Sequence, residues 1–454
     1  MNAVAALRRR IDAKRDPHGL LNTPLAAYTL GTAQLVASHL PFPVARKLSL
    51  LSAASRRFTR GFMLERCRRA LQPWLTPEKV DAWRAHQIGW QRYYGSFGAI
   101  NSNRALTTSL LLKEPGPNGE KGVLYCSFEF NWMKLLANHD IRRFLADYLL
   151  VGASSYSPGD HRVMASLCGL APDPLFIGIS NRTDIAQYDL FAPWIRPVPI
   201  MACDWLDEDN FHPVPQRERS IDILMVAHFA HLKRHWILFE ALSKMRPDLR
   251  VTLIGRPGDG RTAQSLRDDA KAFGVPQELT IVSNAEFDEV TNHLCNAKVS
   301  LVLTRREGSC VSVTESMFAD TPVILMERSH IGSGAYINRH TGRFATRATL
   351  PQTLTELIEH PGLCSPRAWA IDNISARIAS RKLNTILKQH CMETGQPWTR
   401  DIAPLCWRYV PRYLDSIDAL RLRGGVDRLR EQHGIVLEEF VSEQHALQRH
   451  RRAS

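Results

Sequence analysis

The 454-residue sequence has no paired-cysteine motif and no internal repeat. Its nine cysteines are scattered, none forms a CxxC pair and their number is odd, so neither a disulfide framework nor a zinc knuckle is predicted. A reducing cytoplasm is the natural location for such a chain. No solenoid-length period and no long low-complexity stretch occurs either. Together these absences exclude a cystine scaffold, a zinc-finger protein and a repeat protein.

The N-terminal region also lacks the signals of export and membrane insertion. Three arginines at positions 8–10 are followed by charge and proline, not by a compact apolar run, so no signal peptide is expected. Residues 17–45 contain no Lys, Arg, Asp or Glu, but polar residues dilute the apolar stretch from Leu25 to Leu40 and prolines flank it. A spanning helix needs about 20 mostly apolar residues. We therefore expect a buried or interfacial helix here.

Positive charge is concentrated in the first quarter of the chain. The formal net charge is +13, and residues 1–121 contain 19 Lys and Arg against 7 Asp and Glu. Such a block suits an anionic membrane surface or a nucleic acid, and no nucleic-acid partner is expected because no recognition module is present.

Within this block, apolar residues at near-helical spacing alternate with arginines, which predicts an amphipathic helix. The helix either docks on a membrane or packs on its own domain with a solvated basic face. The apolar residues are Leu48, Leu51, Phe58, Phe62, Leu71 and Trp74, and the arginines are Arg56, Arg57, Arg60, Arg66, Arg68 and Arg69.

Two α/β lobes are expected after this block. The first, residues 106–213, has strand-like runs separated by turns and a helix over Met133–Asp147. In the second, residues 214–365, strands and helices alternate as in a doubly wound parallel sheet. The runs of the first lobe are Thr107–Glu114, Gly122–Phe128, Tyr148–Gly152, Leu175–Ile179 and Val198–Met201. The strands of the second are Ile221–Val226, Arg250–Ile254, Leu279–Val282, Val299–Leu303 and Pro322–Met326, and its helices are Trp236–Met245, Ala263–Phe273, Phe287–Asn296 and Ser312–Ala319.

The predicted domain organisation is therefore a basic helical region (1–105), an N-terminal lobe (106–213), a C-terminal lobe (214–365) and a polar helical tail (366–454) with a closing helix over Leu429–His445. Doubly wound sheets bind their ligands at the carboxyl ends of their strands. We therefore look for the site in the loops that follow the strands of the second lobe.

The richest of these loops connects Val299–Leu303 to the next helix. Glu307 lies on the loop, Gly308 lets the backbone approach a ligand, and Ser309 or Ser312 can cap the helix. The free N–H groups at that helix start suit a diphosphate. Glu315, in the early turns of the helix, can reach ribose hydroxyls beside it.

This segment resembles the C-terminal half of the family 4 retaining glycosyltransferases of the GT-B fold. That family has two glutamates separated by seven residues, then a small-residue turn and Pro-Val opening the next strand. Glu307, Glu315 and Asp320-Thr321-Pro322-Val323 match this pattern. The resemblance implies two Rossmann-like lobes with a cleft, the acceptor on the N-terminal side and the nucleotide sugar held by the C-terminal lobe.

Two further segments extend the resemblance. The family places an arginine, and a lysine five positions later, after the first strand of the C-terminal lobe to neutralise the donor diphosphate. Here Lys233 is at the lysine position, His228 replaces the arginine, and Arg234 is a candidate to compensate. Residues 205–213 are similar to the family's hinge. The family's Gly-Gly loop after its first strand is replaced by Phe128–Asn131.

The resemblance implies retaining transfer of a sugar from a UDP- or GDP-sugar to a glycan or lipid-linked acceptor, in polysaccharide or glycoconjugate synthesis. The catalytic residues would be Glu307, Lys233 and Arg234, and the donor-binding residues Glu315, Gly308, Ser309 and His228. No cofactor is expected. The acidic cluster Asp204, Asp207, Glu208 and Asp209 coincides with the hinge, and no metal is expected there or elsewhere.

Two alternatives stay open. One is a nucleotide-sugar epimerase or hydrolase of the same fold, and the other is a degenerate, non-catalytic protein that binds sugar nucleotides. The expected location is the cytoplasm, with peripheral attachment to the inner face of the membrane as a further hypothesis.

Overall fold

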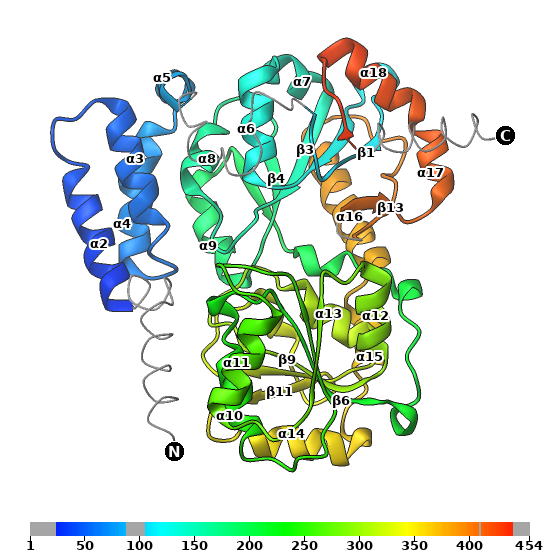
Figure 1. The fold of residues 1–454 in the computed structure, drawn as a ribbon. Coiled ribbons are helices and arrows are strands. Elements are labelled where there is room, and N and C mark those ends of the chain that lie inside the picture. Colours follow the sequence, from blue (N-terminus) through cyan, green and yellow to red (C-terminus); the bar gives the residue numbers. More distant parts are fainter. Residues whose placement is uncertain (1–23, 88–104, 408–409, 439–454) are drawn as a thin grey trace. The chain divides into compact units, whose positions relative to one another are not determined.

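The computed structural model describes residues 24–87, 105–407 and 410–438 (Figure 1). The chain divides into two compact units, one containing Leu206–Ser375 and the other containing Ala27–Trp205 and the chain from Ala376 onward. Each unit is built around its own parallel or mostly parallel β-sheet. The two Rossmann-like lobes and the helical regions at both ends of the chain confirm the predicted fold class.

The unit formed by Leu206–Ser375, the C-terminal lobe, contains a six-stranded sheet in the order β11-β10-β9-β6-β7-β8. Every strand pair in it is parallel. The five expected strands are present, and β11 is an addition that its short, polar sequence did not predict. The strands are β6 (Ile221–Val226), β7 (Val251–Gly255), β8 (Leu279–Ser283), β9 (Ala297–Val302), β10 (Val323–Met326) and β11 (Gly342–Ala345).

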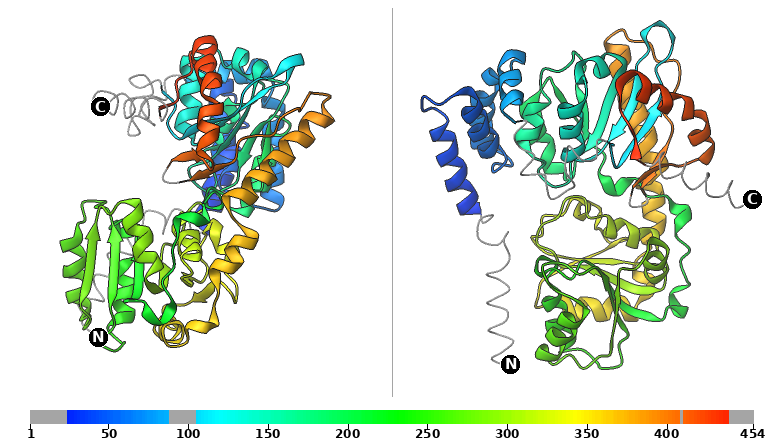
Figure 2. Two further views of the ribbon diagram at one scale, coloured as in Figure 1. Left: turned by 90° about the vertical axis from the view of Figure 1, so that its right-hand side faces the viewer. Right: turned by 45° about the horizontal axis from the view of Figure 1, so that its top comes forward.

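Helices cover both faces of this sheet (Figure 2). One layer packs aliphatic side chains such as Leu238, Leu266 and Leu354 onto the strand residues Leu253 and Leu301. The predicted helix Trp236–Met245 ends at Leu242, because residues 243–245 continue as a tight turn. The first layer contains α10 (His235–Leu242), α11 (Ala263–Phe273) and α14 (Leu350–Glu359), and the second contains α12 (Phe287–Cys295), α13 (Val311–Phe318) and α15 (Pro366–Asn373).

The other unit contains a five-stranded sheet in the order β1-β2-β3-β4-β5, in which β1 is antiparallel and the other pairs are parallel. The strand predicted over Val198–Met201 is wrong in its bounds, because the residues that pair with β4 are Ile195–Val198. The helix predicted over Met133–Asp147 is two helices, since the Asp140 carboxylate caps a new one. The elements are β1 (Ser109–Lys113), β2 (Gly122–Cys126), α6 (Glu129–Asn138), α7 (Ile141–Asp147), β3 (Tyr148–Ala153), α8 (His161–Ser166), β4 (Leu175–Gly178), α9 (Ile185–Tyr188) and β5 (Ile195–Val198).

After the C-terminal lobe the chain returns to this second sheet. Leu383 and Leu387 of α16 (Ala376–Glu393) pack on Val123 and Phe176. A two-stranded sheet then follows, which the prediction of a purely helical tail missed. The helix predicted over Leu429–His445 is also wrong, because Gly434, at φ 66°, ends it. These elements are β12 (Leu405–Trp407), β13 (Pro411–Tyr413), α17 (Ser416–Arg421) and α18 (Arg423–His433); residues 439–445 lie outside the described part.

Residues 24–87, the described part of the chain before the first sheet, contain four α-helices (Figure 1). Most of the predicted apolar stripe is buried, with Leu48, Leu51, Phe58 and Leu71 at most 6% exposed, whereas Phe62 is 70% exposed. These helices therefore pack on their own domain, which was the second alternative. Among the described residues, no helix is long and apolar enough to cross a membrane. The helices are α2 (Pro24–Ala37), α3 (Val44–Ser55), α4 (Phe62–Leu71) and α5 (Pro77–Gln87).

Candidate functional site

The structure brings Lys233 and Glu307 together at the carboxyl edge of the C-terminal sheet. Lys233 ends a short 3-10 turn after β6, and Glu307 lies on the loop after β9. The Lys233 ammonium donates a hydrogen bond to the Glu307 carboxylate, and the two side chains are 19% and 18% exposed. They come from neighbouring strands, because β6 pairs with β9 in the sheet. The pair is therefore screened only in part and is open to a ligand.

The loop that carries Glu307 is held by the loop after β10. The backbone N–H of Glu307 donates to the carbonyl of His330 (2.9 Å). The N–H of Gly332 donates to the carbonyl of Gly308 (2.7 Å), and that of Ser333 to the carbonyl of Ser309 (3.2 Å). Gly308 and Ser309 are thus buried and used through their carbonyls. The two loops fix each other and hold Glu307 in place.

The residue that immediately precedes helix α13 is Cys310, not the Ser309 or Ser312 that the sequence suggested. Cys310 precedes the helix in the left-handed region (φ 52°) and makes no capping hydrogen bond. The Ser312 hydroxyl instead contacts the Cys310 sulfur at 3.5 Å. Without a cap, the first turn keeps the partial positive charge of a helix start available for an anion.

Glu315 is buried in the second turn of α13, with 7% of its surface exposed. Among the residues that the structure describes, none donates a hydrogen bond to its carboxylate or forms an ion pair with it. Burial raises the pKa of Glu315 from 4.5 to about 7. A buried carboxylate without donors is costly to keep ionised. A hydrogen-bond donor from a ligand would stabilise the ionised form of this carboxylate.

The basic side chains around this edge differ in their charge and in their contacts. His228, two residues after β6, has its pKa lowered by partial burial and by the charges of Lys233 and Arg256. It is therefore neutral near pH 7, unlike the arginine of the family pattern. The Arg234 guanidinium donates to the Leu303 carbonyl (3.4 Å) and lies over the Trp236 ring, 5.7 Å from its centroid.

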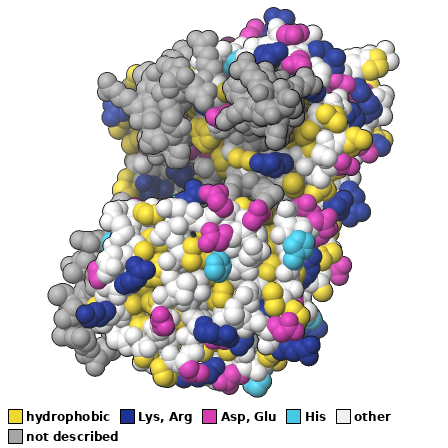
Figure 3. Space-filling view, turned by 45° about the vertical axis from the view of Figure 1, so that its right-hand side comes forward, with side chains coloured by type: hydrophobic (Ala, Val, Ile, Leu, Met, Phe, Trp, Pro, Cys, Tyr) yellow, Lys and Arg dark blue, Asp and Glu magenta, His cyan; other side chains and the backbone are white. Residues whose placement is uncertain are grey.

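Arg256 is a candidate that the sequence analysis missed. It follows Gly255 at the carboxyl end of β7, and its side chain is exposed. Its position directly after a parallel strand was the available signal. Elsewhere on the C-terminal lobe, basic and acidic side chains lie side by side over the face that Figure 3 shows. The field that favours an anion is therefore local, from Lys233, Arg256 and the start of α13.

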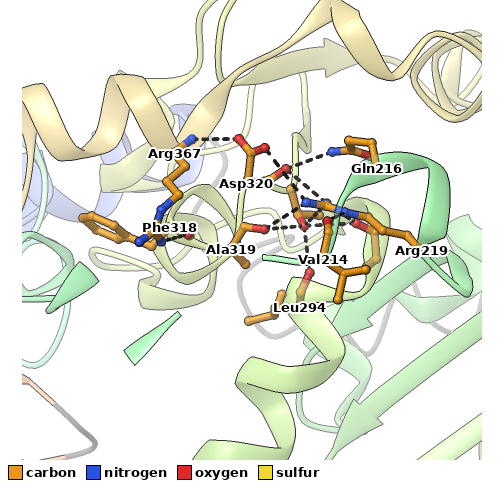
Figure 4. Close-up of polar contacts among 10 residues, drawn as sticks. Val214, Gln216, Arg219, Leu294, Phe318, Ala319, Asp320 and Arg367 are labelled. Atoms are coloured by element: carbon orange, nitrogen blue, oxygen red, sulfur yellow. Dashed lines mark hydrogen bonds and ion pairs between the residues drawn. The ribbon is translucent and has the colours of Figure 1, made fainter. Parts of the chain in front are cut away.

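The far end of α13 is clamped by two arginines (Figure 4). The Arg219 side chain is 2% exposed and donates to the carbonyls of Val214 (2.9 Å) and Ala297 (2.6 Å) and to those of Ala319 and Asp320. Arg367 donates to the Phe318 carbonyl at 2.5 Å. Guanidinium groups at a helix C-terminus satisfy its last carbonyls and complement its dipole. The helix that carries Glu315 is thus fixed at one end and uncapped at the other.

The corresponding edge of the other lobe is filled by its own side chains. Phe128 takes the place of the expected Gly-Gly loop and adopts φ 75°, a conformation that favours glycine. The buried Glu129 carboxylate accepts hydrogen bonds from the backbone of Ser155 (3.0 Å) and Asp160 (3.3 Å). The first residue of α6 therefore uses its carboxylate to hold the loop after β3.

The acidic hinge residues have structural partners. The Asp204 carboxylate accepts from the Met201 N–H (2.9 Å), and Asp207 caps the turn that contains Asp209. Within the described ranges, no three His, Cys, Asp or Glu side chains are grouped to hold a metal. The absence of a bound metal stays a prediction.

Comparisons with known proteins give a family for the lobe that holds this site. Residues 207–360 match the family model of the glycosyl transferases group 1. No curated protein matches the chain.

Similar solved structures include HepE of Anabaena in complex with UDP and glucose (13% identity, 59% of this chain and 78% of that chain, TM-score 0.46). Sucrose-phosphate synthase from Thermosynechococcus elongatus is another (13%, 70% and 80%, TM-score 0.47). The lipopolysaccharide outer core galactosyltransferase WaaB is a third (12%, 69% and 82%, TM-score 0.44). These similarities are too distant to assign the fold, which the strand order establishes by itself. The matched residues 207–360 contain every predicted site residue, so the site lies in the part of the chain that is similar to the glycosyl transferases group 1.

Proposed function

We propose that this glycosyltransferase is a retaining enzyme that transfers a hexose from a UDP- or GDP-sugar to a glycan or lipid-linked acceptor, without a bound metal. The observation that carries the proposal is one sheet edge with three features: the Lys233–Glu307 pair, a helix start whose N-cap residue gives no side-chain cap, and a buried carboxylate to which no described residue donates. A nucleotide sugar offers a partner for each of them.

Glu315 is the proposed ribose contact. A ribose presents two neighbouring hydroxyl donors, and hydrogen bonds to a charged group contribute about 1.5–3 kcal/mol. Accepting them would favour the ionised carboxylate and bring its raised pKa down again. Because ribose is common to UDP and GDP, this contact selects a nucleotide without choosing the base.

The diphosphate is assigned to Lys233, with Arg234 and the start of α13 beside it. Negative charge grows on the diphosphate as the glycosidic bond breaks, so preorganised cations stabilise the transition state more than the ground state. In the ligand-free enzyme Lys233 is held by Glu307. The arriving diphosphate competes for that ammonium and frees the Glu307 carboxylate for the hexose hydroxyls.

The proposed setting is the cytoplasmic side of a membrane where polysaccharides or glycoconjugates are assembled. A lipid-linked acceptor would place the reaction at an anionic surface, which suits the basic first quarter of the chain. A soluble glycan acceptor would make such attachment unnecessary. The two cases are separable by testing both acceptor types.

The test starts with thermal unfolding in the presence of UDP, GDP, ADP and their sugar conjugates, since a ligand stabilises by mass action. We expect UDP or GDP to raise Tm and Glu315→Ala to abolish the rise, and comparison with ADP measures how much the base contributes. Transfer with the selected donor is then followed by NMR, where retention gives a product with the anomeric configuration of the donor. EDTA should leave the rate unchanged.

The rivals give different results in the same experiment. An epimerase or hydrolase would convert the nucleotide sugar at full rate without any acceptor. A non-catalytic binding protein would show the Tm shift and no product with any acceptor. No shift with any nucleotide, in a protein that unfolds cooperatively, would overturn the proposed site.

A further inference from the structure

Helix α2 presents an apolar face to solvent. It contains no charged residue. Gly31 and Leu35 are buried on its inner face, where Gly31 lies so close to Phe58 that an added Cβ would come within 2.7 Å of the Phe58 ring. This contact fixes the rotation of the helix. The opposite side, at helical spacing, exposes Thr29, Ala33, Val36 and Leu40, and Val36 and Leu40 are 65% and 51% exposed.

Basic residues lie beside this face, and acidic residues are missing from the surrounding sequence. No Asp or Glu occurs between Pro17 and Leu64. Arg46 lies over the Phe42 ring, 4.0 Å from its centroid, in the segment that follows α2. Arg57 donates to Gln34 of α2 at 3.2 Å. An uncharged helix face with apolar side chains, in a stretch of sequence whose only charges are cations, complements an anionic surface.

We propose that α2 and the segment after it form a docking surface for an anionic membrane, with α2 lying in the plane of the headgroups. The docking surface is defined as Thr29, Ala33, Val36, Leu40, Arg46 and Lys47. At 14 residues, α2 is about 21 Å long, too short to cross a hydrocarbon core of about 30 Å. Its apolar face can enter the headgroup boundary while Arg46 and Lys47 meet the phosphates.

This surface differs from the arginine stripe that the sequence suggested. Arg56 donates to the Pro158 carbonyl, and Arg68 and Arg69 pair with Glu65, so those cations are used within the fold. A second copy of the chain is a poorer occupant than a membrane. Self-pairing of this face would bring Arg46 and Lys47 toward their own copies, with no acidic residue in the stretch to offset them.

The inference deepens the proposed function, because membrane docking places the site beside a lipid-linked acceptor. The contact itself does not require catalysis, so its test does not depend on the donor site. The binding constant for an anionic leaflet changes on the order of fivefold per basic residue, and salt screens this attraction.

The experiment is flotation of the full chain with vesicles of phosphatidylcholine alone or with added phosphatidylglycerol, at low and high salt. We expect binding to the anionic vesicles at low salt only. Val36→Asp/Leu40→Asp should lower the bound fraction at least tenfold, and Arg46→Gln/Lys47→Gln about twentyfold. Ile417→Asp, at a side chain 64% exposed on α17, and Arg182→Gln, at another exposed position, are the matched controls and should bind like wild type.

Every variant is first checked for an unchanged Tm and for an unchanged nucleotide-induced Tm shift, which separates this inference from the proposed function. Equal binding to neutral vesicles, no binding to anionic vesicles at low salt, or unchanged binding of the Val36/Leu40 variant would overturn the proposal. So would a concentration-dependent dimer in sedimentation velocity that this variant abolishes, because the face would then belong to a second copy.

Discussion

Two buried glutamates, one in each lobe, lie near the start of a helix that follows a strand, and their surroundings are opposite. Glu129 accepts two backbone hydrogen bonds, from Ser155 and Asp160, whereas Glu315 accepts none from any described residue. Both are less than 10% exposed. The first carboxylate is part of the fold and locks a loop. The second carboxylate is buried without contributing to the stability of the fold. A buried polar group of this kind is a candidate for contact with a ligand.

The same contrast extends to the strand edges around them. In the C-terminal lobe the edge keeps a cation and a carboxylate paired within reach of solvent. In the other lobe the chain fills its own edge, with Phe128 in a conformation that favours glycine. Similar Rossmann-like sheets thus have different uses, and the difference lies in which polar groups are left for a partner.

The largest effect should come from removing either member of the half-buried Lys233–Glu307 pair. Lys233→Ala and Glu307→Ala should each lower kcat on the order of 10²–10³-fold, because the first removes a cation from the leaving diphosphate and the second removes the group that positions the hexose. Steady-state kinetics with the donor selected by thermal shift measures this. Lys244→Ala, a lysine 57% exposed in the same lobe, is the control and should leave kcat unchanged. Normal turnover in both site variants would remove this edge from the reaction.

Next in size is the clamp at the end of α13. Arg219→Met should destabilise the C-terminal lobe by about 3 kcal/mol, because the carbonyls of Val214, Ala297 and Ala319 lose a buried donor. Denaturant unfolding measures this change. Arg217→Met, two residues away at a side chain 87% exposed, should change stability by less than about 0.5 kcal/mol. Equal effects of the two substitutions would show that Arg219 is not a clamp.

The two glutamates themselves give the third prediction. Because burial raises the pKa of Glu315 to about 7, the folded chain binds its proton more tightly than the unfolded chain does. The fold therefore loses stability as pH rises from about 4.5 to 7, by up to about 3 kcal/mol. Glu315→Gln removes this loss, so it should raise Tm at pH 8 and change little near pH 4.5. Glu129→Gln should instead lower Tm at pH 8, because two backbone N–H groups lose a charged acceptor. The expected loss in the free energy of unfolding is about 1–2 kcal/mol.

Thermal unfolding of ligand-free protein at the two pH values checks both signs. A Glu315→Gln variant that is less stable than wild type at pH 8 would mean that the carboxylate has a donor after all. In that case the two glutamates would be equivalent, and the argument for a reserved ligand contact would fail.

The sequence predicted the C-terminal sheet well because buried parallel strands are continuous apolar runs, and helices alternate with them at short intervals. Lys233 and Glu307 were also predicted to be site residues, and the neighbouring strands β9 and β6 bring them into contact. The resemblance to a family supplied those residues, and the fold supplied their distance.

Three features escaped the sequence for physical reasons. Arg219 lies in a polar stretch that looks like a surface loop, and only tertiary packing buries it. The bounds of β5 are set by its pairing with β4, because the apolar residues near Val198 fit a strand that begins a few residues earlier or later equally well. The apolar stripe around Leu48 has the same spacing whether it faces a membrane or a protein core.

The smallest effect concerns His228, where this chain differs from its family pattern. Partial burial and the nearby charges of Lys233 and Arg256 lower its pKa below 6.5, so it is neutral at pH 8 and contributes little to diphosphate binding. His228→Ala should therefore change the Kd for UDP or GDP by less than about twofold. His228→Arg adds a permanent charge at the position where the family has arginine, and should tighten binding about five- to tenfold. Arg234→Ala should weaken nucleotide binding more than His228→Ala does. Isothermal titration calorimetry at pH 8 gives the Kd of wild type and of the three variants. A large loss in His228→Ala together with an unchanged Arg234→Ala would reassign the cation to His228 and make the C-terminal edge depend on pH near the histidine range.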